Sequence, residues 1–163
     1  MKKHFVAVAT MTLLLGSAAQ ADATKIGLGI DIVNPAEYAL RMPIDLQDNL
    51  RIEPKFGISY QDNDDTSATG FKIGTFVGLL NPVNKNVSIY YGGFLEIGYA
   101  NTSYDNDLIK DNSATQFGFG GAFGFEYYLD SHVSLGGEAR VGIGFGDATS
   151  FGTDASALMR YYF

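Results

Sequence analysis

The chain has 163 residues, a length that suits one domain, and it contains 12 phenylalanines, 10 tyrosines, 20 glycines and no cysteine. Eighteen acidic residues stand against eleven basic ones, so the chain lacks the basic surface that nucleic-acid binding requires. The absence of cysteine excludes a disulfide framework, a thiolate metal site and a cysteine nucleophile. High glycine and aromatic content favours strands over helices.

The first 21 residues have the pattern of a signal peptide. Lys2 and Lys3 supply positive charge, residues 5–16 are apolar, and Ala19-Gln20-Ala21 places small residues at the −3 and −1 positions of a cleavage site. The apolar segment is shorter than the roughly 20 residues of a membrane-spanning helix, which disfavours the alternative of an uncleaved anchor. We expect cleavage after Ala21 and export of a mature domain, residues 22–163, with nine basic and eighteen acidic residues.

The mature domain alternates apolar and polar side chains almost continuously, as half-buried strands do. Between residues 50 and 60, for example, Ile52, Phe56 and Ile58 share one face, while Arg51 and Glu53 share the other. The same period of two predicts eight strands, over residues 26–32, 38–46, 50–60, 71–79, 87–99, 117–129, 133–145 and 155–163.

The connections between these strands alternate in length. Short turns are expected at residues 47–49, 81–86 and 130–132, and longer polar loops at residues 61–68, 100–113 and 146–152. The first connection on the long side, near residues 34–37, is short. Short turns at one end and longer loops at the other are typical of an outer-membrane barrel.

Side-chain volume predicts which face of the strands points inward. An eight-stranded barrel has an interior just wide enough to be filled by side chains. One face of residues 117–129 carries Phe117, Phe119, Phe123 and Phe125, whereas the other carries mostly glycine and alanine. Only the small face fits inside. The pattern therefore predicts an all-β fold, an eight-stranded antiparallel transmembrane up-and-down β-barrel with lipid outside and polar groups inside.

Twelve charged side chains fall on the predicted inner face, six acidic and six basic, although the chain as a whole is acidic. Buried charges need partners, so we expect ion pairs that plug the interior. Reflecting the strands about their turns places Lys72 opposite Glu96 and Asp45 opposite Arg51. The alternative is a wet channel that these charges only line. The set comprises Asp31, Arg41, Asp45, Arg51, Glu53, Lys55, Lys72, Glu96, Glu126, Glu138, Arg140 and Arg160.

The last strand ends in Arg160-Tyr161-Tyr162-Phe163, and Phe125-Glu126-Tyr127-Tyr128-Leu129 precedes a tight turn. In these features the mature domain resembles small bacterial outer-membrane β-barrels of the OmpA/OmpX type. The resemblance implies that Tyr161 and Phe163 form an assembly signal read by the barrel-assembly machinery. It also implies periplasmic chaperones during biogenesis and residence in the outer membrane of a Gram-negative cell. We expect a barrel alone, without the periplasmic domain of full-length OmpA.

A catalytic role is not expected. Small barrels that deacylate lipid A resemble this chain in fold and use a His–Ser pair facing the membrane. The mature domain has one histidine, His132, which follows Ser131 in a predicted periplasmic turn. Adjacent turn residues normally diverge, and a dyad also needs a third group that orients the ring. We therefore interpret both residues as part of a polar turn.

Two acidic segments are interpreted as solvated loops rather than metal sites. A calcium loop is excluded because Ser67 occupies the position that needs glycine, and Ile73 the position of the bidentate glutamate. A weak Ca²⁺ or Mg²⁺ site associated with lipopolysaccharide is the alternative. We predict no metal and no cofactor. The acidic residues are Asp62, Asp64, Asp65, Asp105, Asp107 and Asp111.

Together these patterns predict an integral outer-membrane protein with a structural or surface-interaction role. That role is envelope integrity, or adhesion through the loops at residues 61–68, 100–113 and 146–152. A narrow pore for ions or small solutes is the alternative. The expected partners are outer-membrane lipid, lipopolysaccharide and an extracellular ligand, with no nucleic acid. We expect a monomer, because a closed barrel has no free edge.

Overall fold

The computed structural model describes residues 23–34, 37–63, 66–104, 112–147 and 149–163. The predicted signal peptide, residues 1–21, lies outside these ranges. Within them, no helix has both the length and the apolar character needed to cross a membrane.

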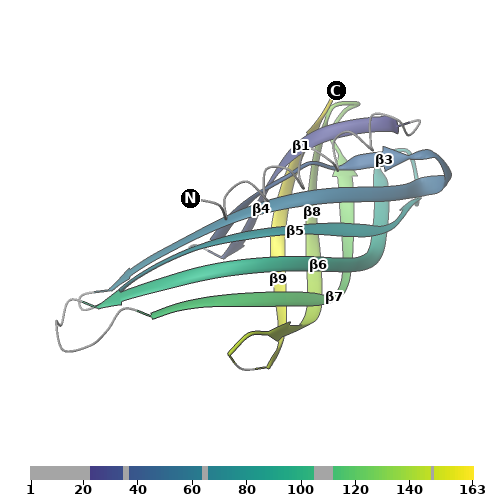
Figure 1. Cartoon of the computed structure of the whole chain (residues 1–163). Coiled ribbons are helices and arrows are strands. Elements are labelled where there is room, and N and C mark those ends of the chain that lie inside the picture. Colours follow the sequence, from purple (N-terminus) through teal and green to yellow (C-terminus); the bar gives the residue numbers. More distant parts are fainter. Residues whose placement is uncertain (1–22, 35–36, 64–65, 105–111, 148) are drawn as a thin grey trace.

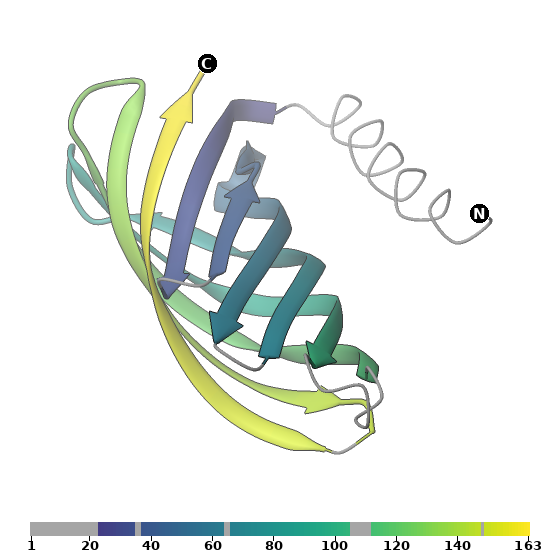
Figure 2. The ribbon, with the colours of Figure 1, turned by 90° about the vertical axis from the view of Figure 1, so that its left-hand side faces the viewer.

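The described residues form one antiparallel sheet that closes on itself (Figures 1 and 2). Strands β1 and β9 complete the closure by pairing Gly27 with Tyr162 and Ile32 with Ala157. Figure 2 shows β1 in purple beside β9 in yellow. The elements are β1 (Ala23–Asn34), β2 (Glu37–Arg41), β3 (Ile44–Leu46), the 3-10 turn η1 (Gln47–Asn49), β4 (Leu50–Asn63), β5 (Thr66–Pro82), β6 (Val87–Tyr104), β7 (Asn112–Tyr128), β8 (Val133–Phe145) and β9 (Ser150–Tyr162).

The second spanning strand is interrupted, so nine strand segments make an eight-stranded barrel. Strands β2 and β3 both pair with β1 and with β4. Between them, Pro43 has no N–H to give to the ladder. Its carbonyl still accepts a hydrogen bond from the Gly27 amide at 2.9 Å, and the Met42 amide donates to the Pro54 carbonyl at 3.0 Å. The predicted fold class, a closed eight-stranded antiparallel barrel, is confirmed.

One end of the barrel, which we call the turn end, carries the short connections. These are η1 and residues 83–86 and 129–132. Asn49 closes η1 with a φ of 61°, in the left-handed region that asparagine adopts more readily than most residues. The opposite end, the loop end, carries the connections between β4 and β5, between β6 and β7, and between β8 and β9.

The loop end differs from the sequence-based prediction, because strands occupy much of the expected loops. Strand β4 continues to Asn63 and β5 begins at Thr66, within the loop predicted at 61–68. Strand β6 continues to Tyr104 and β7 begins at Asn112, within the loop predicted at 100–113. Strand β9 begins at Ser150, within the loop predicted at 146–152. In these extensions the backbones of neighbouring strands remain paired, but neither face of the strands is apolar. The side chains therefore do not alternate between apolar and polar, which is the pattern that predicts a strand from sequence.

This extension makes the rim of the barrel uneven. The last pair between β7 and β8 joins Phe117 to Phe145, whereas β6 and β7 remain paired as far as Thr102 and Asn112. Strands β4 to β7 therefore project past the end of β8, as Figure 1 shows.

The apolar side chains face outward, as side-chain volume predicts. Phe119, Phe123 and Phe125 on β7 are 42%, 54% and 51% exposed, and Ile30 on β1 is 57% exposed. A barrel that presents such a surface is matched to lipid. Tyrosines on several strands share this outer surface and are suited to membrane interfaces: Tyr38, Tyr60, Tyr91, Tyr99, Tyr127 and Tyr161.

Candidate functional site

The barrel interior is the candidate site, because charged side chains converge there from every strand. The structure places all twelve charged residues of the predicted inner face inside the barrel. Ten are buried, while Lys72 and Glu96 are partly buried. We call the buried part of this arrangement, together with Tyr90 and Tyr162, the interior network.

Arg41 is the centre of the network's middle level. Its Nε donates to Asp31 at 2.9 Å, its Nη1 to Glu53 at 3.2 Å, and its Nη2 to Glu138 at 2.8 Å. These three acids come from β1, β4 and β8, so one guanidinium spans the lumen. Lys55 adds a second cation, with its Nζ 3.2 Å from Asp31.

Arg51 organises the level nearest the turn end. It is fully buried, donates to Asp45 at 2.6 Å and to Glu126 at 2.8 Å, and also donates to the Tyr162 hydroxyl at 2.8 Å. Asp45 and Arg51 are register partners on β3 and β4, as reflection about the turn predicts.

Arg160 joins the two levels. Its Nη2 donates to both carboxylate oxygens of Glu53, at 3.0 and 2.9 Å, and its Nη1 lies 3.4 Å from Glu126. Both bonds come from one terminal nitrogen, and such charge-assisted hydrogen bonds are stronger than neutral ones. Together, Arg41, Arg51 and Arg160 connect acids from five strands across the lumen.

Aromatic side chains complete the filling, and the sequence analysis did not assign them this role. Tyr90 and Tyr162 are fully buried, and Phe76 and Phe94 are 4% and 7% exposed. The Tyr90 hydroxyl donates to Glu138 at 3.1 Å, and its ring packs edge-on against Phe76. Their place on the charged face of each strand is the sequence signal that identifies them. Glycines opposite them make the room: a Cβ on Gly124 would collide with the Tyr90 ring.

The predicted register of Lys72 is wrong. Lys72 is opposite Gly98, and Glu96 is opposite Gly74. The turn between β5 and β6 is centred one residue later along the chain than the sequence-based prediction placed it. The cross-strand partner of Lys72 therefore moves by two positions, from Glu96 to Gly98. The Lys72 ammonium lies 3.9 Å from Glu96 but 3.1 Å from Glu37, an acid on β2 that the sequence analysis did not include.

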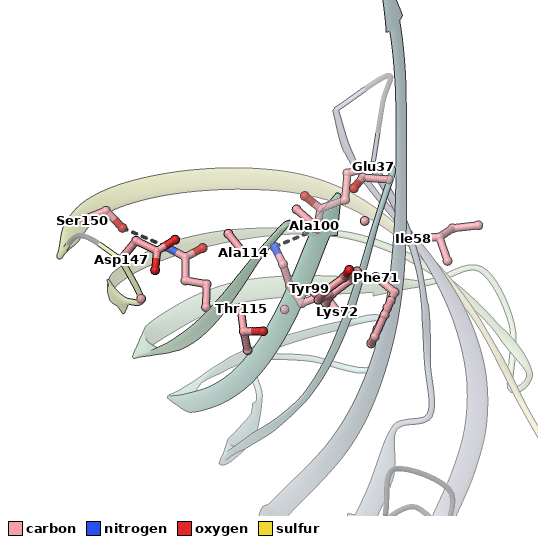
Figure 3. Close-up of a pocket in the computed structure, with 16 residues that line it drawn as sticks. Glu37, Ile58, Phe71, Lys72, Tyr99, Ala100, Ala114, Thr115, Asp147 and Ser150 are labelled. Carbon is pink, nitrogen blue, oxygen red and sulfur yellow. Dashed lines mark hydrogen bonds and ion pairs between the residues drawn. The ribbon is translucent and has the colours of Figure 1, made fainter. Parts of the chain in front are cut away.

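Above the network, the loop-end half of the lumen contains two adjoining cavities of about 410 and 160 Å³. We call them together the vestibule. Lys72, Gly98, Gln116 and Ser150 line both cavities. Figure 3 shows the larger one, with Lys72 paired to Glu37 on one wall and Ser150 on another. The Ser150 hydroxyl accepts a hydrogen bond from the Gln116 amide at 3.1 Å.

The floor of the vestibule is charged and aromatic. Phe94 and Glu96 line the smaller cavity. The Arg140 guanidinium lies 3.7 Å from the centre of the Phe94 ring and donates to Glu96 at 3.1 Å. This contact closes the vestibule towards the turn end.

The Ser131–His132 pair differs from the expectation in one respect. Ser131 Oγ lies 2.8 Å from His132 Nδ1, so these adjacent side chains meet rather than diverge. Both are exposed in the turn between β7 and β8, and the His132 ring stacks on Tyr161. The Asp130 carboxylate accepts the backbone amides of His132 and Val133 at 2.7 Å, and these hydrogen bonds hold the pKa of Asp130 below its usual value. Asp130 thus stabilises the turn through backbone amides, and these hydrogen bonds do not involve the His132 imidazole.

Neither acidic segment forms a metal site within the described ranges, where no three His, Asp or Glu side chains are placed to hold a metal ion. Asp62 lies on β4 and accepts a hydrogen bond from the Tyr60 hydroxyl at 3.2 Å. Asp64, Asp65, Asp105, Asp107 and Asp111 lie outside those ranges.

The two residues of the predicted assembly signal lie at the turn end on the outer surface. Tyr161 is 49% and Phe163 73% exposed, and their rings pack edge-on at 5.6 Å. The Phe163 amide donates to the Ile26 carbonyl on β1 at 2.9 Å, which anchors the chain end against the first strand.

Comparison with protein-family models finds a match over residues 5–159 to the outer membrane protein beta-barrel domain. Comparison with curated proteins finds no match. Among solved structures, Neisserial surface protein A is similar, with a TM-score of 0.61, 18% identity, and coverage of 85% of this chain and 94% of that one.

Two further solved structures are similar. Ail, the attachment invasion locus protein of Yersinia pestis, has a TM-score of 0.53 and 11% identity, covering 85% of this chain and 93% of its own. The N-terminal β-barrel domain of Pseudomonas aeruginosa OprF has a TM-score of 0.51 and 13% identity, covering 88% and 98%. At these identities the likeness establishes the fold alone.

Proposed function

The chain belongs to the outer membrane protein β-barrel domain family, and from this premise we propose that it has a structural or surface-interaction role in the outer membrane. The role is envelope integrity, or adhesion through the loop end of the barrel. In this proposal the turn end faces the periplasm and the loop end faces the outside.

The interior network is the observation that carries the proposal. Ion passage would require space between Arg41, Arg51 and Arg160, yet each of these side chains is at most 3% exposed and bonded to acids on other strands. Separating such a buried pair would leave a charge without a partner in the interior, which is costly in free energy. Thermal motion therefore rarely opens the interior network. A sealed barrel contributes a rigid wall and an external surface rather than a conduit.

The remaining parts of the proposal concern biogenesis and partners. We propose that the signal peptide is cleaved after Ala21 and that periplasmic chaperones deliver the chain. The barrel-assembly machinery then reads Tyr161 and Phe163, which are exposed at the turn end. Outer-membrane lipid and lipopolysaccharide surround the monomeric barrel, and an extracellular ligand binds at the loop end.

The proposed role is not enzymatic. The Ser131–His132 pair lies in a turn at the periplasmic end, away from the outer leaflet. Within the described residues, the His132 ring forms a hydrogen bond with Ser131 and stacks on Tyr161, and no carboxylate or carbonyl forms a hydrogen bond with its second nitrogen as in a catalytic triad.

A narrow channel for ions or small solutes is the second candidate, and the vestibule favours it. Its cavities of about 410 and 160 Å³ reach from the loop end towards the middle of the lumen. They end at Phe94 and Arg140, so conduction would need movement of the interior network.

Deletion of the gene tests the proposal, because the two candidates predict effects of opposite sign. A structural role predicts that the deletion strain becomes more sensitive to detergent and admits more of a large dye, and that the full-length gene reverses both changes. A channel predicts slower uptake of small solutes with an intact barrier to large ones. That second pattern would overturn the structural proposal.

A further inference from the structure

The outer surface of the barrel is hollowed at the loop end of strands β2, β4, β5 and β6. We call this hollow the outer groove. Its volume is about 570 Å³, within the roughly 300–1,000 Å³ of sites that hold small molecules. Tyr38, Ile58 and Phe71 line the groove, and their exposed side chains belong to the apolar outer face of the barrel. The outer groove is therefore a feature of the surface that is matched to lipid.

The groove exists because a small side chain lies between larger ones. Thr69 on β5 is opposite Tyr60 on β4 and Asn101 on β6. In the next row of the outer face, Phe71 is opposite Tyr99, and the centres of their rings are 5.4 Å apart. All five residues line the groove. Thr69 thus lies at its floor, while the aromatic side chains form its walls.

The groove crosses the boundary between lipid and water. Towards the turn end it continues onto Ile97, which is exposed on the outer face of β6. Towards the loop end the outer side chains are polar. The Asn101 amide donates to the Ser103 hydroxyl at 3.3 Å, and the Tyr60 hydroxyl donates to a carboxylate, that of Asp62, at 3.2 Å. Tyrosine suits such a boundary because its ring is apolar and its hydroxyl is polar. An occupant of the groove must be apolar at one end and polar at the other.

The polar end of the groove favours neutral hydrogen-bonding groups over phosphate. Within the described ranges, no lysine or arginine lines the groove. A phosphate placed there would lack the cation that usually pairs with it, and the Asp62 carboxylate beside Tyr60 would repel it. The Thr69 hydroxyl and the Asn101 amide can both donate and accept hydrogen bonds. Hydroxyl and amide groups on the occupant would match them.

We propose that the outer groove binds one acyl chain of lipopolysaccharide, with the amide and hydroxyl groups of its acylated amino sugar bonded to Thr69 and Asn101. Lipid is the occupant because the groove is continuous with the surface that is matched to lipid. Lipopolysaccharide, unlike a phospholipid, supplies acyl chains joined directly to a neutral amide. The inference rests on the proposed function, which places the loop end at the outside, where lipopolysaccharide lies. It adds one fixed site to the lipid that surrounds the barrel.

Fluorescence quenching in vesicles tests the proposal, because the natural chain contains no tryptophan. Ile97→Trp places a reporter beside the groove. Phe145→Trp is the control, because Phe145 lies in the same cross-strand row, two strands away on β8. The full chain is expressed, and each variant is purified from the outer membrane into excess vesicles of phosphatidylcholine with brominated acyl chains, which quench tryptophan on contact. Unbrominated lipid A, the acylated amino-sugar part of lipopolysaccharide, is then added. Unbrominated phosphatidylcholine is the control lipid.

The proposal predicts that lipid A restores the fluorescence of Ile97→Trp at about a tenfold lower mole fraction than that of Phe145→Trp, because hydrogen bonds in the groove add to apolar contact. Phosphatidylcholine should restore both equally. Adding Thr69→Phe to Ile97→Trp fills the groove and should remove the preference for lipid A. Thr153→Phe, which adds the same ring to the outer face of β9 opposite the exposed Val141, should keep it. Circular dichroism melting verifies that each variant is folded.

Two results overturn the proposal. Equal recovery of both reporters with lipid A would mean that the groove is ordinary lipid-facing surface. A preference that persists after Thr69→Phe would place the binding site elsewhere. Either result leaves the effects of gene deletion unchanged, so the proposed structural role is tested separately.

Discussion

At the scale of single residues, Glu126 shows how the interior depends on complete pairing. Its carboxylate is fully buried and accepts hydrogen bonds from Arg51, Ser134 and the Tyr162 hydroxyl. We predict that Glu126→Ala lowers the free energy of unfolding by about 3–5 kcal/mol, because it removes one of the two carboxylates that pair with the buried guanidinium of Arg51. Urea unfolding in lipid vesicles measures the change. Asp62→Ala, at an exposed site on β4, serves as control and should change stability by less than about 0.5 kcal/mol.

Glycine positions give a second prediction at this scale. Gly124→Ala places a Cβ against the Tyr90 ring, whereas Gly152→Ala places one in open space. We expect Gly124→Ala to destabilise the barrel by about 1–3 kcal/mol through overpacking. Gly152→Ala should be neutral or slightly stabilising, because it reduces the entropy of the unfolded chain. Melting temperatures of the two variants, compared side by side, measure this difference. Equal losses would contradict the packing seen around Tyr90.

At the scale of elements, strand β1 must pair with β9 for the barrel to close. Ile30 and Met159 are register partners on the outer face, and the natural chain has no cysteine. We predict that an Ile30→Cys/Met159→Cys variant forms an intramolecular disulfide on mild oxidation, because directly opposed residues have Cα atoms within about 5.5 Å. Electrophoresis without reductant detects it as a mobility shift.

The control for this cross-link uses the same strand and the same face. Ala155 lies four residues from Met159, a separation of about 13 Å along β9. Ile30→Cys/Ala155→Cys should therefore remain reduced within one chain. Efficient cross-linking in both variants would show that the two strands slide past each other.

The sequence alone predicts the strands wherever one face of the strand contacts lipid. Alternation gives all eight spanning strands and the inward direction of the charged residues, because lipid outside and a narrow lumen inside impose opposite side-chain types. It does not predict the projecting ends of β4 to β7, where both faces are polar. Nor does it give the register of Lys72, because a shift of one residue at the turn centre moves the partner by two positions.

At the scale of the whole molecule, the two halves of the lumen differ in charge and in filling. The turn-end half is densely paired and closed, and the loop-end half is open and acidic. The net charge counted from the sequence does not reveal this division. The division depends on which carboxylates form ion pairs with the same arginine, and only the structure shows these pairs. The lumen therefore combines a sealed interior at the turn end with an open vestibule at the loop end.

Single-channel recording in a planar bilayer tests the sealed interior most directly. The account predicts that wild type shows no discrete openings. Glu96→Ala should also be silent, because Glu96 lines the vestibule above the network. Glu53→Ala/Arg160→Ala should conduct, since it removes a complete ion pair from the middle of the lumen without changing net charge. Steady discrete openings by the wild-type protein would contradict the account and favour the channel.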